Sequence, residues 1–416
     1  MKIFKFGGAS VKDAAGVRNV AEVLKHFALD DLVIVVSAMG KTTNALEEIV
    51  WAYTDGRATG ELVDALQRSH TDILKEVAPR DDEATRALEA HFAGLRSILS
   101  QPPTEVDRDY DRIVSQGELW STLVVGAHLH QAGIANTWVD ARTIVRTDTS
   151  HRSARVDWET SGKRASTLTN EVVGSPKRIV TQGFIGFSSE GETTTLGREG
   201  SDFSAAIFAY LLDAESVTIW KDVPGMFNAD PNRFPGTQLL SHISYREAIE
   251  LSYFGASVIH PRTLQPLQKK QIPLYVRSFN DMLAQGSTIS EATDHDTLVP
   301  SFIIKPAQLL ISITPRDLSF IVEENLSGIF KLFAQRNVRI DLMQNSAVAF
   351  SVVVDDNPRS RQLIDELGRE YEVRYNDGCE LLTVRHYDEA TLERLTRGKE
   401  ILIEQRSRVT ARFVMK

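Results

Sequence analysis

Residues 1–40 read MKIFKFGGAS VKDAAGVRNV AEVLKHFALD DLVIVVSAMG, and their pattern predicts a strand, a glycine turn, a helix and a second strand. Ile3 to Phe6 is a short apolar run that ends at Gly7-Gly8. Val11 to Phe27 carries apolar residues at helical spacing. Leu32 to Val36 is a continuous apolar run, which is typical of a strand covered by helices on both faces. This order predicts an α/β domain with parallel strands.

The alternation of helices and strands continues to about residue 285. From about 43 to 133 the pattern is helical throughout, with one long stretch from Tyr110 to His130. Strand-like segments follow, separated by helical patterns at 203–212 and 244–254. These strand-like segments are Asn136–Asp140, Arg178–Phe187, Val217–Trp220 and Leu274–Ser278. We therefore expect residues 1–285 to form one catalytic-type α/β domain, a largely parallel sheet sandwiched by helices.

The remainder of the chain has a different order of elements. The pattern predicts strand, helix, strand, strand, helix and strand, in that order. The segments are 309–314, 328–336, 338–342, 347–355, 360–367 and 371–375. This is the ferredoxin-like α+β order, and we expect it to span residues 300–376. A partial repeat over 377–416 stops before a second helix and a fourth strand.

Composition and charge exclude several classes of protein. Of the 416 residues, 42% are hydrophobic and 25% are charged, which excludes general disorder. The 47 Lys and Arg against 56 Asp and Glu give a net charge of −9, which disfavours nucleic acid as the main partner. A few local cations can still bind a small anion. The ten histidines contain no HExxH spacing and no Gly-x-Ser-x-Gly motif occurs, so metallohydrolase and serine-hydrolase functions lack support.

Cysteine content and hydropathy predict the compartment. Cys379 is the single cysteine, so neither an intramolecular disulfide nor a cysteine zinc site can form. The N-terminal residues lack the apolar run of a signal peptide, and no segment has the length of a membrane span. We therefore expect a cytoplasmic protein without a membrane partner.

Three glycine-bearing motifs stand where chemistry is expected. Lys5 precedes Gly7-Gly8 at the end of the first strand, an arrangement that favours phosphate but also occurs in ordinary tight turns. Arg198 lies between glycines before the helix at 203, where Ser201 or Asp202 could equally serve as the helix cap. Gly117 sits inside a helical pattern, next to Glu118, where glycine costs about 1 kcal/mol. That cost favours a close backbone approach or a ligand, although a solvated glutamate remains an equal alternative.

The segment Ser37 to Thr42 superficially resembles a phosphate-binding P-loop. That motif requires a glycine five residues before the Gly-Lys-Thr, and here Val35 occupies the position, inside a strand. We therefore interpret Ser37 to Thr42 as a plain turn between strand and helix.

Six motifs in this order resemble the aspartate kinases of the amino-acid-kinase superfamily. They are KFGGAS (5–10), SAMGKTTN (37–44), QGE (116–118), GFIGFSSEGETTTLGREGSD (183–202), WKDVPGMFNADPNR (220–233) and FGASVIHPRT (254–263). The tail resembles the family's regulatory ACT units. The resemblance implies the amino-acid-kinase fold and ATP-dependent phosphorylation of the side-chain carboxylate of L-aspartate, with Mg²⁺ as cofactor. The product would be 4-phospho-L-aspartate, on the way to lysine, threonine and methionine.

The resemblance also implies roles for residues at matching positions. Lys5 would neutralise the transferring phosphoryl group, and Asp202 would orient Lys5 or a water bound to Mg²⁺. The substrate-binding residues implied are Arg198 for the α-carboxylate, Glu118 for the ammonium group, and Thr43 and Ser201 for further hydrogen bonds. The nucleotide-binding residues implied are Gly7, Gly8, Ser10, Lys221, Asp222, Phe227 and Arg233. No side chain is assigned as a metal ligand.

Five positions depart from the family's pattern. Ala9 replaces a threonine, Glu199 a glycine, and Phe227 a common tyrosine. Ser257 stands where a lysine often reaches the ATP phosphates, and Lys41 replaces a small or apolar residue. Lys5, Glu118, Arg198 and Asp202 are all present, so we expect an active enzyme.

The residues of the ACT-like tail do not decide whether an end product regulates the enzyme. Related ACT units bind an end product such as lysine or threonine, but Glu324 occupies the place of an expected glycine here. Feedback inhibition and insensitivity therefore both stay open. Because the second unit ends with unpaired strand edges, we expect a homodimer joined through the ACT-like units. The alternative functions are a sister kinase with a glutamate-type acceptor and a catalytically weak amino-acid sensor.

Overall fold

The computed structural model describes residues 1–27, 31–171, 178–256, 258–317 and 319–416, with side chains left undescribed at 168–171. The chain forms two compact units. The first comprises Met1–Met226, Leu239–Ile249 and Val258–Thr293, and the second comprises Phe227–Gln238, Glu250–Ser257 and Asp294–Lys416. None of the described helices is long and apolar enough to cross a membrane.

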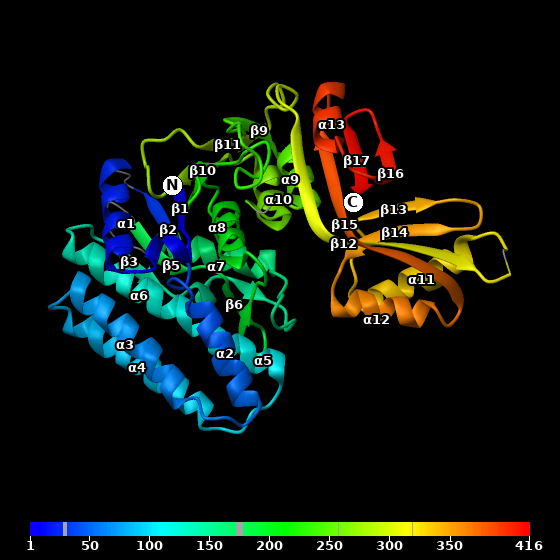
Figure 1. Cartoon of the computed structure of the whole chain (residues 1–416). Helices are drawn as coiled ribbons and strands as arrows, with labels where there is room; N and C mark the ends of the chain where they lie inside the picture. The colour runs from blue at the N-terminus through cyan, green and yellow to red at the C-terminus, as the bar shows by residue number, and fades with distance from the viewer. Residues whose placement is uncertain (28–30, 172–177, 257, 318) are drawn as a thin grey trace. The chain divides into compact units, whose positions relative to one another are not determined.

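The first unit contains an eight-stranded sheet (Figure 1). In spatial order its strands are β3 (Thr137–Val139), β5 (Arg178–Gln182), β2 (Leu32–Val36), β1 (Lys2–Phe6), β8 (Ser216–Lys221), β10 (Leu274–Ser278), β11 (Ser287–Ser290) and β9 (His242–Ser244). All neighbouring strands are parallel except β10 and β11. The predicted largely parallel sheet is therefore confirmed.

Helices cover both faces of this sheet. Among them, α6 and α8 contact strands of the sheet directly, whereas α3 and α4 pack on α6, and α10 packs on α8. The helices between residues 14 and 270 are α1 (Ala14–Phe27), α2 (Thr42–Thr54), α3 (Gly60–Val77), α4 (Asp82–Leu99), α5 (Val106–Val114), α6 (Gln116–Gln131), α7 (Trp158–Glu171), α8 (Gly200–Leu211), α9 (Tyr245–Phe254) and α10 (Pro261–Lys270). Phe4, Ile34 and Val36 belong to one core cluster with α1 and α6. Ile3 and Val35 alternate with them and are also buried, because α8 contacts β1 and β2.

Two predicted segments are each divided in the structure. The stretch from Tyr110 to His130 ends one helix at Val114 and begins another at Gln116. The stretch from Arg178 to Phe187 turns at Gly183, where a Cβ atom would lie 2.5 Å from the Cβ of Ser201. Beyond that turn, β6 (Ile185–Ser188) joins β4 (Arg146–Thr147) and β7 (Thr193–Thr195) in a small separate sheet that the sequence pattern did not predict.

The second unit is built on a six-stranded antiparallel sheet. Its spatial order is β13 (Leu342–Asn345), β14 (Phe350–Asp355), β12 (Ser301–Pro315), β15 (Tyr371–Arg385), β17 (Thr410–Met415) and β16 (Ile401–Arg406). The helices are α11 (Glu323–Gln335), α12 (Pro358–Leu367) and α13 (Glu389–Thr396). β14 and the first part of β15 flank the later part of β12, from Gln308 onward. Residues 308–376, called the first module below, therefore have the ferredoxin-like strand order predicted for an ACT unit.

Residues 377–416 hold three strands and one helix, so a fourth strand for this second module has to come from elsewhere in the chain. β12 and β15 are both 15 residues long and pair along two successive parts, with a register shift between Lys305 and Gln308. The part from Ser301 to Lys305 pairs with Leu381 to Arg385, and so fills the fourth position of the second module. This strand precedes the first module in the sequence. The second module still has one helix, α13, where a complete unit has two.

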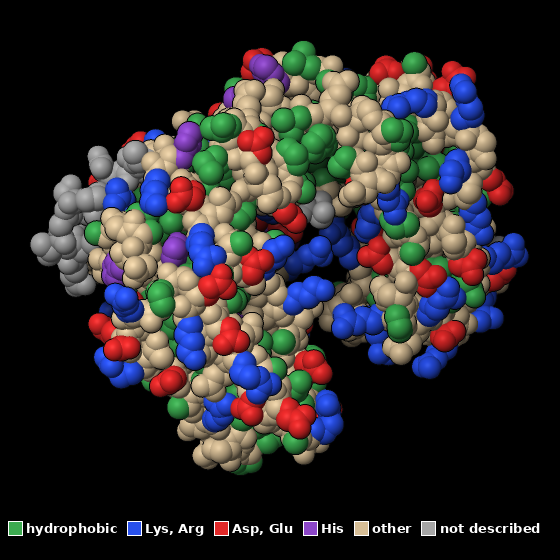
Figure 2. Space-filling view, turned by 60° about the vertical axis from the view of Figure 1, so that its left-hand side comes forward, with side chains coloured by type: hydrophobic (Ala, Val, Ile, Leu, Met, Phe, Trp, Pro, Cys, Tyr) green, Lys and Arg blue, Asp and Glu red, His purple; other side chains and the backbone are tan. Residues whose placement is uncertain are grey.

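Charged side chains of both signs are interspersed over much of the face drawn in Figure 2. This mixture follows from the near balance of 47 basic and 56 acidic residues.

Candidate active site

A cavity of about 580 Å³ lies in the first unit, at the carboxyl ends of β1, β2 and β8. Its lining residues are Lys5, Gly8, Ser37, Ala38, Gly40, Thr43, Tyr110, Glu118, Arg152, Phe184, Gly197, Arg198, Glu199, Gly200, Ser201, Asp202 and Lys221. The carboxyl ends of parallel strands are where open α/β sheets bind ligands. The cavity brings together eight of the thirteen residues predicted for the site.

The glycine turn after β1 is required by close packing of two backbone segments. The Gly40 amide donates to the Gly8 carbonyl at 2.9 Å. A Cβ atom on Gly8 would lie 2.7 Å from the carbonyl oxygen of Ala38, which a real Cβ does not tolerate. The two loops at the ends of β1 and β2 therefore touch only because residue 8 has no side chain.

Three charged side chains meet at the floor of the cavity. Asp202, in the first turn of α8, has Lys5 Nζ at 2.6 Å from one oxygen and Lys221 Nζ at 3.1 Å from the other. Burial alone would raise the pKa of Asp202, but the two lysines outweigh it and hold that pKa below the usual value. The predicted pairing of Asp202 with Lys5 thus has direct geometric support. Lys221 also donates to the Val258 carbonyl.

Glu118 is a buried carboxylate on the cavity wall, with 3% of its surface exposed. Its Oε2 has no hydrogen-bond partner among the described residues. Burial raises its pKa to about 8, and a backbone contact at Ala38 and the charge of Lys5 only partly oppose this. A buried carboxylate with an unpartnered oxygen favours a positively charged ligand.

Gly117 lets α6 approach α2 closely. A Cβ at this position would lie 3.0 Å from Leu46 Cδ1, 3.0 Å from Thr42 Cγ2 and 3.1 Å from Ala38 Cβ. The helical glycine is therefore explained by close packing, and this packing places Glu118 beside the strand ends.

Arg198 stands on the turn between β7 and α8. The turn has left-handed backbone at both neighbours, with φ of 79° at Gly197 and 54° at Glu199. A glycine is expected at position 199 in the family because that conformation disfavours a side chain. Arg198 is exposed and forms no ion pair with any residue in the described ranges, so its guanidinium group is available to an anion.

Five predicted residues do not line the cavity. Gly7 lies close by, since a Cβ there would be 3.5 Å from Lys5 Nζ. The Ser10 hydroxyl faces the Trp220 carbonyl oxygen at 3.5 Å, and Asp222 is exposed. Phe227 and Arg233 belong to the second unit.

Among the positions that depart from the family's pattern, Lys41 is exposed and is not a lining residue. Ser257 falls outside the described residues.

Two lining residues, Tyr110 and Arg152, lie outside all six sequence motifs. Tyr110 donates from Oη to Glu47 Oε1 at 2.6 Å. The guanidinium carbon of Arg152 lies 4.3 Å from the centre of the Tyr110 ring. No motif marked either residue, because both reach the cavity through contacts between distant segments.

Comparisons with known proteins identify relatives of this chain. The profile of the Amino acid kinase family matches residues 1–278. Lysine-sensitive aspartokinase 3 of Escherichia coli is 30% identical over 396 residues, covering 92% of this chain and 86% of that protein. The chloroplastic bifunctional aspartokinase/homoserine dehydrogenase 2 of Arabidopsis thaliana is 33% identical over 303 residues. That alignment covers 71% of this chain and 33% of the longer relative.

Solved structures agree with these sequence relatives. Crystal structures of E. coli aspartokinase III, one with lysine and aspartate and one with aspartate and ADP, match with a TM-score of 0.82 at 26% identity. They cover 100% of this chain and 95% and 96% of theirs. The profile match and the relative at 30% identity together show that this chain belongs to the amino acid kinase family and, within it, to the aspartokinases.

Proposed function

We propose that this chain transfers the γ-phosphoryl group of ATP to the side-chain carboxylate of L-aspartate. The single observation that carries the proposal is the content of the cavity. One buried carboxylate with an unpartnered oxygen (Glu118), one unpaired arginine (Arg198) and a lysine pair on Asp202 line the same 580 Å³ space. A free amino acid with two carboxylates and one ammonium group complements these charges.

The chemistry needs no general base from the protein. A carboxylate with a pKa of about 3.9 is already ionised at neutral pH and can attack phosphorus directly. The obstacle is repulsion between this anion and the phosphate chain, so the protein must position the reactants and neutralise charge. Lys5 and Lys221 would supply that positive charge. Asp202 would hold both ammonium groups in place, because it is buried between them.

Acceptor recognition would rest on Arg198 and Glu118, which line the same cavity. Arg198 would bind the α-carboxylate through its planar fork, and Glu118 would accept from the ammonium group. Thr43 and Ser201 both line the cavity and would add hydrogen bonds to the acceptor. The Glu118 and Arg198 pair favours an acceptor with a free amino group and a free α-carboxylate over an N-acylated one.

Nucleotide binding is supported at the strand ends. Backbone amides at Gly7 and Gly8 would cradle phosphate oxygens, next to Lys5. Ser10 belongs to the same turn, and its own amide donates to the Gly7 carbonyl at 2.9 Å. The other residues of the first unit proposed for ATP are Lys221 and Asp222.

We propose that Mg²⁺ takes part in the reaction, and we base this on the side chains available to hold it. In the described part of the chain, no group of three or more carboxylate, histidine or cysteine side chains forms a metal site. The residues instead fit an ion that arrives with ATP and keeps phosphate oxygens and water as ligands. Asp202 would then hold it through its water ligands. When bound, the ion would neutralise phosphate charge.

We also propose a homodimer joined through the first ACT-like module. β13 is an edge strand of the six-stranded sheet, and edge strands can pair with another chain. One of its backbone groups, the Met343 carbonyl, already accepts from Gln405 Nε2 at 2.8 Å. Met343 on this strand and the neighbouring Val348, Phe320 and Val322 are exposed apolar side chains. Ile321 and Ala347, whose backbones hydrogen-bond at 3.0 Å, hold these segments together.

The tail would bind an end-product amino acid, and lysine is the first candidate because the E. coli relative is named lysine-sensitive. Glu324 lies in the first turn of α11 without a left-handed backbone, so glycine is not required there. Insensitivity to lysine remains the alternative outcome. The cytoplasmic location stays a prediction from the single cysteine.

The function is tested by trapping the product. The chain is incubated with Mg-ATP, hydroxylamine and L-aspartate, L-glutamate or N-acetylglutamate, because hydroxylamine converts an acyl phosphate to a hydroxamate. We expect hydroxamate with L-aspartate only, and none from a Lys5→Ala variant. Product with glutamate but not aspartate would support a sister kinase, and ligand binding without turnover would support a sensor.

A further inference from the structure

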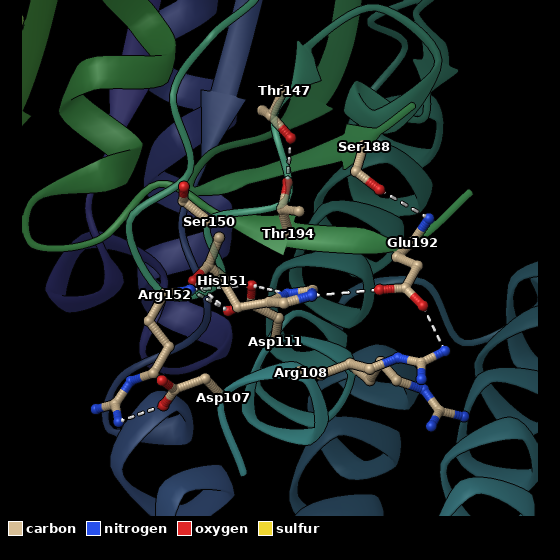
Figure 3. Close-up of polar contacts among 12 residues, drawn as sticks. Asp107, Arg108, Asp111, Thr147, Ser150, His151, Arg152, Ser188, Glu192 and Thr194 are labelled. Carbon is tan, nitrogen blue, oxygen red and sulfur yellow. Dashed lines mark hydrogen bonds and ion pairs between the residues drawn. The ribbon is translucent and has the colours of Figure 1, made fainter. Parts of the chain in front are cut away.

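Three distant segments meet at the buried carboxylate of Asp111, near the cavity (Figure 3). His151 Nδ1 lies 2.9 Å from Oδ2, and the Thr195 hydroxyl donates to Oδ1 at 2.5 Å. The backbone amide of Arg152 donates to both oxygens, at 3.2 and 3.1 Å. His151 in turn contacts Glu192, which pairs with Arg108. Asp111 therefore ties α5 to the turn at 151–152 and to β7.

The turn that Asp111 holds is strained. Arg152 has a φ of 63°, a left-handed conformation that costs a residue with a side chain on the order of 1–2 kcal/mol. Such strain persists only where surrounding contacts enforce it, and it is concentrated at functional positions. Here the enforcing contacts are the hydrogen bonds from the Arg152 amide to Asp111.

This turn packs directly against the turn that carries Arg198. The Ala154 amide donates to the Thr195 carbonyl at 2.9 Å. A Cβ atom on Gly197 would lie 3.0 Å from the carbonyl oxygen of Arg152. Arg152 and Arg198 therefore leave adjoining backbone segments, and both side chains line the cavity.

The guanidinium group of Arg152 is held loosely enough to exchange partners. It lies over the Tyr110 ring. It also pairs with Asp107 at 3.1 Å (Figure 3). The side chains of this pair are 41% and 53% exposed, and exposed ion pairs contribute only about 0–1 kcal/mol. A substrate carboxylate inside the cavity can therefore compete with Asp107.

We propose that Arg152 is a second substrate-binding arginine, which with Arg198 clamps the α-carboxylate of the acceptor amino acid, and that Asp111 positions it. The inference rests on the proposed function, because it assumes that an amino-acid acceptor occupies this cavity. The reacting side-chain carboxylate must face Lys5, so the α-carboxylate faces the two arginines. Tyr110 keeps the guanidinium plane aligned through a cation–π contact.

The first test is Arg152→Ala in the full chain. A lost hydrogen bond to a charged group corresponds to about a tenfold to hundredfold rise in the KM for aspartate. We expect kcat and the KM for ATP to change less than about threefold, since the reacting end of the acceptor is untouched. Arg152→Lys should recover only part of the loss, because lysine keeps the charge without the fork. Arg57→Ala is the matched control, since Arg57 is an exposed arginine with an Asp55 partner also at 3.1 Å.

An analogue of aspartate tests which group of the substrate Arg152 binds. L-isoasparagine carries an amide in place of the α-carboxylate and keeps the side-chain carboxylate. Its inhibition constant against aspartate should change much less in Arg152→Ala than the aspartate KM does. Equal weakening of both ligands would overturn the inference, and so would a raised KM for ATP alone.

The positioning role of Asp111 is tested by Asp111→Asn, which keeps the side-chain volume. We expect a higher KM for aspartate at unchanged kcat, and no further rise when Asp111→Asn is added to Arg152→Ala. Fully additive effects would refute positioning through Arg152. Wild-type chain without any aspartate-dependent product would refute the proposed function itself. Active wild type with an unchanged aspartate KM in Arg152→Ala would refute this inference alone.

Discussion

Glu118 should make aspartate binding depend on pH. Burial raises its pKa to about 8, so at pH 6 to 7 the side chain is mostly protonated before substrate binds. The ammonium group of aspartate requires the charged carboxylate. Binding must therefore release a proton, and the apparent affinity should rise by about tenfold for each pH unit below 8 and level off above it.

The perturbation is Glu118→Gln, which keeps the shape and removes the charge. The variant should bind aspartate weakly at all pH values, and the slope of log KM against pH should disappear. The assay is the aspartate KM from pH 6 to 8.5, with proton release measured by titration calorimetry in buffers of different ionisation enthalpy. An aspartate KM independent of pH in the wild type, or a slope retained in the variant, would refute the reasoning.

The raised pKa of Glu118 also predicts how the difference in folding stability between the wild type and Glu118→Gln changes with pH. A rise in pKa from 4.5 to about 8 corresponds to a free energy on the order of 5 kcal/mol against the charged form in the fold. Because the folded-state pKa is the higher one, protonated Glu118 favours the folded chain. The wild type should lose stability relative to Glu118→Gln as pH rises from about 4.5 to 8. Urea denaturation of both proteins at pH 5 and 8 measures this, and an equal difference at the two pH values would contradict it.

Three further substitutions test other parts of the site. Lys5→Ala should lower kcat by about a hundredfold or more, because one preorganised charge at the phosphoryl group is lost; a rate within threefold of wild type would contradict its role. Gly117→Ala should destabilise the fold by about 1–2 kcal/mol in urea denaturation, since the new methyl group would meet Leu46 and Thr42 at 3.0 Å; a stabilised variant would show that α2 can move. Glu199→Gly should raise the free energy of unfolding by up to about 1 kcal/mol, because φ at this position is 54°; unchanged or lower stability would argue against strain there.

The pattern of apolar residues along the sequence predicted those helices and strands that depend mainly on neighbouring residues. The run from Leu32 to Val36 is fully buried in the centre of the sheet, as its apolar composition indicated. The breaks at Ser115 and Gly183 were missed because the apolar pattern continues across both. The turn at Gly183 packs against Ser201, which is distant in sequence and leaves no room for a side chain at 183.

The fourth strand of the second module was also missed because it depends on a contact between residues far apart in the sequence. Ser301 to Lys305 pairs with Leu381 to Arg385, and the whole first module lies between them in the sequence. Pairing at such separation leaves no local periodic signal, so the second module looked unfinished. One reason for expecting a dimer, an unfilled strand position at the end of the chain, is thereby removed, while the exposed edge of β13 supplies another.

Much of the candidate site could be predicted because its motifs follow parallel strands, whose carboxyl ends lie along the same edge of the sheet. Lys5 is the last residue but one of β1, and Asp202 lies in the first turn of α8, so parallel topology brings them together. Arg152 had no such signal. It reaches the cavity only because the buried Asp111 holds its turn in a left-handed conformation, and that contact joins segments 41 residues apart.

The central claim is that the side-chain carboxylate of aspartate attacks the γ-phosphorus of ATP. The direct measurement uses L-aspartate labelled with ¹⁸O in the side-chain carboxylate, with Mg-ATP and hydroxylamine, and mass spectrometry of the phosphate released. Hydroxylamine attacks the acyl carbon, so the bridging oxygen leaves with phosphate. We predict one ¹⁸O in each phosphate, and none when the label is in the α-carboxylate. Unlabelled phosphate from side-chain-labelled aspartate, or labelled phosphate from the α-carboxylate, would contradict the account.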